Sequence, residues 1–112
     1  MSDYVVVFIT ACSPEEGERL AEALVKEMLA ACVNVLPALT SIYCWEGEIR
    51  RDTETLLIVK SHKSVLDYLV KRVKNLHSYE LPEIIALPIV GGLEDYLQWI
   101  GRAVQHGWHN IE

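Results

Sequence analysis

The stretch CVNVLPALTSIYCWEGEIRRDTETLLIVK, residues 32–60, decides the fold of this chain because it predicts one long β-hairpin. Residues 32–45 are rich in β-branched and aromatic side chains and predict an extended strand, with Pro37 marking a bend or bulge. Glu46-Gly47 supplies a tight turn, and residues 48–60 return as a second strand. Each arm has about 13 residues, more than twice the mean strand length of about 5–6.

The far half of this hairpin carries large apolar side chains that one small domain cannot cover. Exposed hydrophobic strand edges invite pairing with another chain. We therefore expect the hairpin to reach a neighbouring subunit, with an interface that contains Tyr43, Cys44, Trp45 and Ile49. Two alternatives stay open: a twisted ribbon folded back over its own domain, and a ligand-stacking role for Tyr43 and Trp45.

The flanking sequence supplies the rest of an α+β domain. Residues 5–9 predict a buried strand, and the capping box that starts at Ser13 begins a helix. Apolar spacing predicts helices over residues 64–76 and 93–106, and a strand over residues 83–90. The order β-α-β-β-α-β with an added C-terminal helix predicts a ferredoxin-like fold, an antiparallel sheet with helices on one face. We expect one domain over residues 1–112.

Composition excludes several classes of protein. The chain has 112 residues, 51% of them hydrophobic, which is typical of a folded globule. No apolar run approaches the ~20 residues of a membrane span, and the N-terminus lacks a basic signal-peptide region, so we expect a cytoplasmic protein. A formal charge of −6 argues against nucleic-acid binding. Cys12, Cys32 and Cys44 show no CxxC spacing and are expected to be reduced thiols.

Residues 76–88, LHSYELPEIIALP, gather the side chains best suited to bind a ligand. His77 and Glu83 offer an imidazole and a carboxylate, which suit Zn²⁺ or Cu²⁺. Two ligands are too few for a closed site, so a thiol, water or another subunit would have to complete it. The alternative role of His77 is to cap the carbonyl end of the preceding helix.

Three further residues are candidates for a ligand cleft: Asn34, Tyr79 and Glu80. The alternatives are a core hydrogen bond for Asn34, packing for Tyr79 and solvation for Glu80. The remaining histidines, at positions 62, 106 and 109, are expected at the surface. No G-x-S-x-G elbow or Walker A loop occurs, so we expect no catalysis.

Three sequence blocks at matching spacing, A-A-C-V-N, T-S-I-Y-x-W-x-G and H-x-Y-x-x-P-E, resemble the CutA family of divalent-cation tolerance proteins. The resemblance implies a ferredoxin-like subunit in a homotrimer similar to the PII signalling proteins. It also implies a role in tolerance of divalent metals, copper above all. The alternatives are a PII-like sensor that binds an organic anion or nucleotide between subunits, and a trimeric scaffold for a partner protein.

Two departures from the family pattern affect the metal site that the resemblance implies. That site joins a cysteine at the end of the first strand to His77 and Glu83, but the cysteine position holds Ile9. Cys12 lies three residues further on and is the remaining candidate thiol. The family's H-P-Y is replaced by an H-S-Y sequence with Ser78, which removes the φ restraint of proline.

Overall fold

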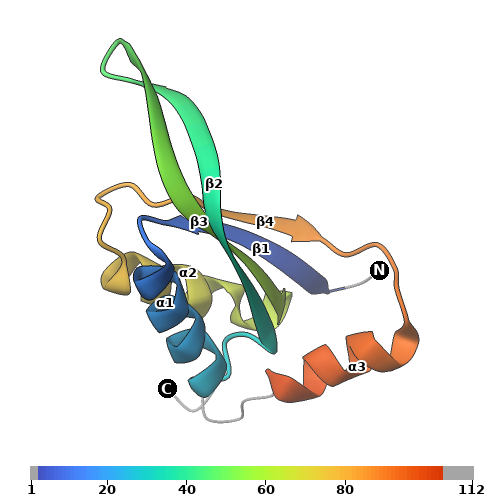
Figure 1. The fold of residues 1–112 in the computed structure, drawn as a ribbon. Helices are drawn as coiled ribbons and strands as arrows, with labels where there is room; N and C mark the ends of the chain where they lie inside the picture. Colours follow the sequence, from blue (N-terminus) through green and yellow to red (C-terminus); the bar gives the residue numbers. More distant parts are fainter. Residues whose placement is uncertain (1–2, 105–112) are drawn as a thin grey trace.

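The computed structural model describes residues 3–104 and has the predicted order of elements (Figure 1). The elements are β1 (Tyr4–Ala11), α1 (Pro14–Lys26), β2 (Cys32–Trp45), β3 (Glu48–His62), the short helical turn η1 (Lys63–Val65), α2 (Leu66–Leu76), β4 (Ile84–Pro88) and α3 (Glu94–Ala103). β4 is shorter than predicted and ends at a proline, which has no N–H to extend a ladder. The predicted helix end at residue 106, with His106 and His109, lies outside the described residues.

The four strands form one antiparallel sheet in the order β2-β3-β1-β4. Figure 1 shows α1 and α2 together on one side of this sheet. Alternation along the strands turns every second side chain toward these helices. The buried side chains of this layer include Val5, Val7, Ile9, Leu57 and Val59 from the sheet and Leu20, Leu24, Leu69 and Val73 from the helices. The predicted α+β architecture with an antiparallel sheet is confirmed, with α1 and α2 on one face.

Local signals at both ends of α1 explain its bounds. The Ser13 hydroxyl accepts a hydrogen bond from the Glu16 N–H at 3.1 Å, and Pro14 occupies the first turn. The helix ends where Met28 adopts a left-handed φ of 59° and the Leu29 N–H donates to the Leu24 carbonyl at 2.8 Å. The predicted cap therefore places Glu16 at the junction between β1 and α1.

The β2–β3 hairpin contains a bulge that reverses which side chains of β2 share a face. Leu36 pairs with Leu56, but the next pair toward the tip is Leu39 with Glu54. The additional residue on β2 is accommodated by Ala38, whose φ is 66°. Beyond this point the odd-numbered residues of β2 take the face that Leu36 occupied. The predicted irregularity at Pro37 is confirmed.

On the sheet face opposite α1 and α2, α3 reaches one end, where Gly101 lies beside Tyr4 and the Tyr96 side chain hydrogen-bonds with Cys32. Register places on this face the side chains of Phe8, Leu36, Leu56, Ile58, Ile85 and Leu87. Ile85 is 50% exposed and Leu87 is 42% exposed. Asn34 pairs with Ile58 on the same face and is exposed, with its side-chain oxygen accepting a hydrogen bond from Lys60. The prediction that Asn34 makes a core hydrogen bond is wrong, because its strand position turns it away from the helices.

Candidate ligand site

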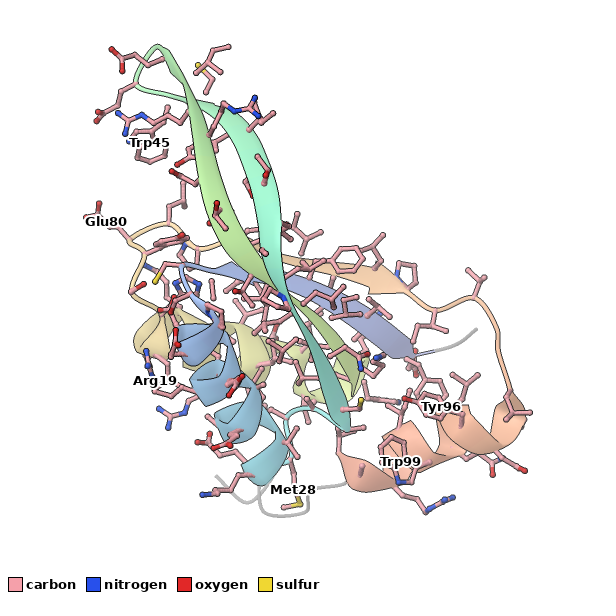
Figure 2. The ribbon with its side chains drawn as sticks, viewed as in Figure 1. Arg19, Met28, Trp45, Glu80, Tyr96 and Trp99 are labelled. Atoms are coloured by element: carbon pink, nitrogen blue, oxygen red, sulfur yellow. The ribbon has the colours of Figure 1, made fainter. Side chains whose placement is uncertain are left out.

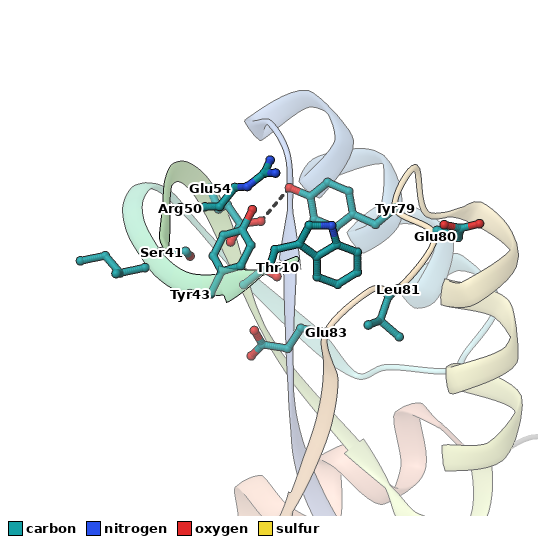
Figure 3. A pocket seen from close by; sticks show the side chains of 11 residues that line it. Thr10, Ser41, Tyr43, Arg50, Glu54, Tyr79, Glu80, Leu81 and Glu83 are labelled. Atoms are coloured by element: carbon teal, nitrogen blue, oxygen red, sulfur yellow. Dashed lines mark hydrogen bonds between the residues drawn. The ribbon is translucent and has the colours of Figure 1, made fainter. Parts of the chain in front are cut away.

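A hollow of about 590 Å³ lies beside the hairpin (Figure 3). Its walls come from the end of β1, the distal part of the hairpin and the loop that follows α2. The residues that line the hollow are Thr10, Ser41, Ile42, Tyr43, Trp45, Arg50, Glu54, Tyr79, Glu80, Leu81 and Glu83. Figure 2 shows Trp45 on the hairpin above the loop that carries Glu80. Five of the predicted residues are thus brought together: Tyr43, Trp45, Tyr79, Glu80 and Glu83.

The centre of the hollow is a hydrogen bond between Tyr79 and Glu54. The Tyr79 hydroxyl donates to Oε2 of Glu54 at 2.7 Å, and the Glu54 residue is only 9% exposed. Burial raises the pKa of Tyr79, and the hydrogen bond to the Glu54 carboxylate and its negative charge raise it further. Tyr79 is therefore a protonated donor that fixes the Glu54 carboxylate in place.

His77 holds the loop to the core with both ring nitrogens. Nε2 lies 2.7 Å from the Thr10 carbonyl, which can only accept, so Nε2 carries the proton. Nδ1 then accepts a hydrogen bond from the Tyr79 N–H at 3.0 Å. The His77 side chain is fully buried. The ring thus binds β1 and its own loop. His77 does occupy the C-cap of α2, but there it is the backbone N–H that donates, to the Val73 carbonyl at 2.8 Å.

Glu16 holds the same loop from the other side. Its carboxylate oxygens accept hydrogen bonds from the Cys12 N–H at 2.9 Å and from the Ser78 N–H at 2.8 Å. Burial alone would raise the pKa of Glu16, but these hydrogen bonds outweigh it and lower the pKa to about 2. A proline at position 78 has no N–H and could not donate this bond.

The residues predicted for a metal do not form a set of ligands within one chain. Both nitrogens of His77 are occupied, and Glu83 lines the hollow, of which His77 is not a wall residue. Cys12 is exposed, and its sulfur lies 3.8 Å from the Ser78 hydroxyl. Within residues 3–104 no group of three His, Cys, Asp or Glu side chains is placed to hold a metal ion. One chain alone does not fit a closed metal site.

The predicted interface residues divide between the hollow and open surface. Tyr43 and Trp45 line the hollow, and the Tyr43 hydroxyl donates a hydrogen bond to Asp52. Cys44 is exposed, and Ile49 is 78% exposed. Whether a second chain covers them is not tested by a single chain, so their interface role stays a prediction.

Sequence reasoning missed three important residues of this region. Glu54 and Arg50 lie in a charged stretch of β3 that is typical of a solvated strand. Glu16 follows Ser13 by three residues, a spacing that predicts a capping box and gives no sign of its contact with the loop. The pairing of Leu39 with Glu54 across the bulge was the available signal. Predicting this pairing from the sequence requires placing the bulge to within one residue, because a shift of one residue changes the partner of Glu54.

Fold and hollow together define a small α+β protein with a four-stranded antiparallel sheet and a carboxylate-rich hollow beside a long hairpin. Residues 5–103 match the family described as "CutA1 divalent ion tolerance protein", and the chain belongs to this family. The divalent-cation tolerance protein CutA of Thermus thermophilus is 53% identical over 95 residues, which cover 85% of this chain and 92% of that protein. The chloroplastic CutA 1 of Oryza sativa is 49% identical over 101 residues.

Solved structures agree with this assignment. The Oryza sativa CutA1 structure has a TM-score of 0.90 at 45% identity and covers 93% of this chain and 95% of that one. The Thermus thermophilus structure has a TM-score of 0.85 at 52% identity, with 87% and 94% covered. The match spans 57% of the Oryza sativa curated protein and 56% of its Arabidopsis thaliana counterpart. The plant relatives are therefore much longer than the matched region.

Proposed function

We propose that the protein is a cytoplasmic homotrimer of ferredoxin-like subunits that binds a cationic ligand and serves divalent-cation tolerance, copper included, without catalysis. The Thermus thermophilus relative carries the name divalent-cation tolerance protein. No helix within residues 3–104 combines the length and apolarity needed to cross a membrane.

The observation that carries the proposal is the set of exposed apolar side chains on the sheet face opposite α1 and α2. Leu36, Ile85 and Leu87 are each at least 42% exposed there, and Ile49 is 78% exposed at the hairpin tip. Contiguous apolar patches of this kind are unusual on monomers and mark interfaces. In a cyclic trimer each chain buries one surface against the next chain, and the ring closes so that no such surface is left exposed. The same assembly would bring the hollow of one chain close to the hairpin of the next.

Metal association at the hollow then requires ligands from more than one chain. Glu80 and Glu83 supply carboxylates on the loop, and the exposed thiol of Cys12 supplies a softer ligand nearby. The same charges argue against the PII-like alternative. An organic anion or nucleotide would meet three carboxylates and only one guanidinium, that of Arg50.

Sedimentation equilibrium tests the assembly. We expect a mass about three times the 12.7 kDa of one chain, and a stable folded monomer would contradict the trimer. Competition titration of Cu²⁺ tests the metal part, with Glu83→Gln compared with Glu18→Gln, an exposed glutamate of α1 that is outside the hollow. We expect weaker binding only for Glu83→Gln, and equal affinities would remove Glu83 from the site.

A further inference from the structure

We infer that the hollow beside the hairpin takes a small organic cation, an alkylammonium or related amine, rather than a bare metal ion alone. This inference rests on the proposed function in one respect, that the hollow is the ligand site. It adds the chemical class of the ligand, which neither the family nor the sequence pattern specifies.

Charge favours a cation. Glu54, Glu80 and Glu83 line the hollow, and Arg50 is the one cationic side chain among its lining residues, which gives a formal charge of −2. Arg50 belongs to an exposed segment of the hairpin, whereas Glu54 is nine-tenths buried. A field of this sign concentrates cations and repels anions at the mouth of the hollow.

The aromatic walls favour an organic cation. Tyr43, Trp45 and Tyr79 contribute three rings, and the faces of such rings attract ammonium groups. Figure 3 shows the rings of Tyr43 and Tyr79 in the hollow, with Tyr79 hydrogen-bonded to Glu54. Ile42 and Leu81 add apolar surface that suits alkyl carbons. A hydrated metal ion gains nothing from these contacts.

Glu54 provides the polar anchor. Its Oε2 accepts the Tyr79 hydrogen bond, whereas Oε1 is accessible to solvent, since Thr55 Oγ1 is the one buried side-chain oxygen or nitrogen without a partner in the described part of the chain. This accessible carboxylate oxygen is open to a further hydrogen-bond partner from the hollow. An ammonium N–H supplies that partner and forms a charge-assisted hydrogen bond.

The spacing of the carboxylates separates an organic cation from a metal. No three acidic, histidine or cysteine side chains in residues 3–104 converge closely enough to hold one ion. A diamine does not need convergence, since its two charged ends can meet different carboxylates. The hollow of about 590 Å³ has ample room for such a molecule.

Calorimetric titration of the full chain with putrescine tests the inference, with butanediol and succinate as neutral and anionic probes of the same length. We expect saturable heat with putrescine only. Glu54→Gln should weaken putrescine binding about tenfold, because a charge-assisted hydrogen bond becomes a neutral one. Glu18→Gln removes the same charge from the exposed face of α1 and should leave the affinity within about twofold. Trp45→Leu keeps an apolar wall but removes the aromatic ring. It should lower the affinity for putrescine by a larger factor than any affinity for butanediol.

Circular dichroism confirms that each variant is folded before titration. Absence of saturable putrescine binding, equal losses in Glu54→Gln and Glu18→Gln, or tighter binding of succinate would each overturn the inference. A monomer, or a chain that binds no Cu²⁺, would contradict the proposed function yet leave a Glu54-dependent putrescine response intact. A copper-binding trimer with no putrescine response would overturn this inference alone.

Discussion

Replacing Glu16 by glutamine should destabilise the fold by removing the carboxylate that joins β1, α1 and the loop after α2. Its two oxygens accept from the Cys12 and Ser78 N–H groups at 2.9 and 2.8 Å. Glutamine has one carbonyl oxygen and one NH₂ group, so one of these two backbone N–H groups would face the side-chain NH₂ instead of an acceptor. The lowering of the Glu16 pKa from 4.5 to about 2 corresponds to about 3 kcal/mol at neutral pH, an upper bound for the loss.

The pH dependence gives a second readout with a definite sign. Because the pKa of Glu16 is lower in the folded state, its stabilisation is complete above pH 4.5 and is lost as the pH falls toward 2. Urea unfolding followed by circular dichroism at equal protein concentrations should show this loss in the wild type and not in Glu16→Gln. Glu15→Gln, in the same first turn but exposed, is the control. If Glu16→Gln and Glu15→Gln differ by less than about 0.5 kcal/mol at pH 7, the assigned role is wrong.

Three further changes have definite expected results. Tyr79→Phe should cost about 1–2 kcal/mol in urea unfolding, because the buried Glu54 carboxylate loses its donor; an unchanged midpoint would contradict this. Met28→Gly should stabilise by up to about 1 kcal/mol in the same assay, since the left-handed φ of 59° disfavours a side chain; a loss of stability would show that the Met28 side chain matters more than its backbone. Deleting Ala38 should remove the bulge and turn Trp45 out of the hollow, which quenching of Trp45 fluorescence by iodide would detect against a Trp99→Phe, Trp108→Phe background.

Regular elements could be predicted from the sequence because their signals are local. The capping box at Ser13, the turn at Gly47 and the apolar spacing of the helices each depend on a few adjacent residues. The loop after α2 has no such period, so its residues could be recognised as functional but not placed. His77 and Glu83 are both candidate metal ligands from the sequence, yet the loop turns His77 into the core and leaves Glu83 at the hollow. Those directions are set by Glu16 and Thr10, which are distant in sequence.

One backbone irregularity decides the chemistry of the hollow. Without the bulge, the residues of β2 that share a face with Leu36 would all be even-numbered. Ile42 and Cys44 would then point to the same side of the sheet as Glu54. The additional residue near Ala38 exchanges them for Tyr43 and Trp45, so aromatic rings and a buried carboxylate come to share one face. Holding a non-glycine residue in the left-handed region costs about 1–2 kcal/mol. Deletion of Ala38 should therefore alter the bulge and the ligand chemistry of the hollow together.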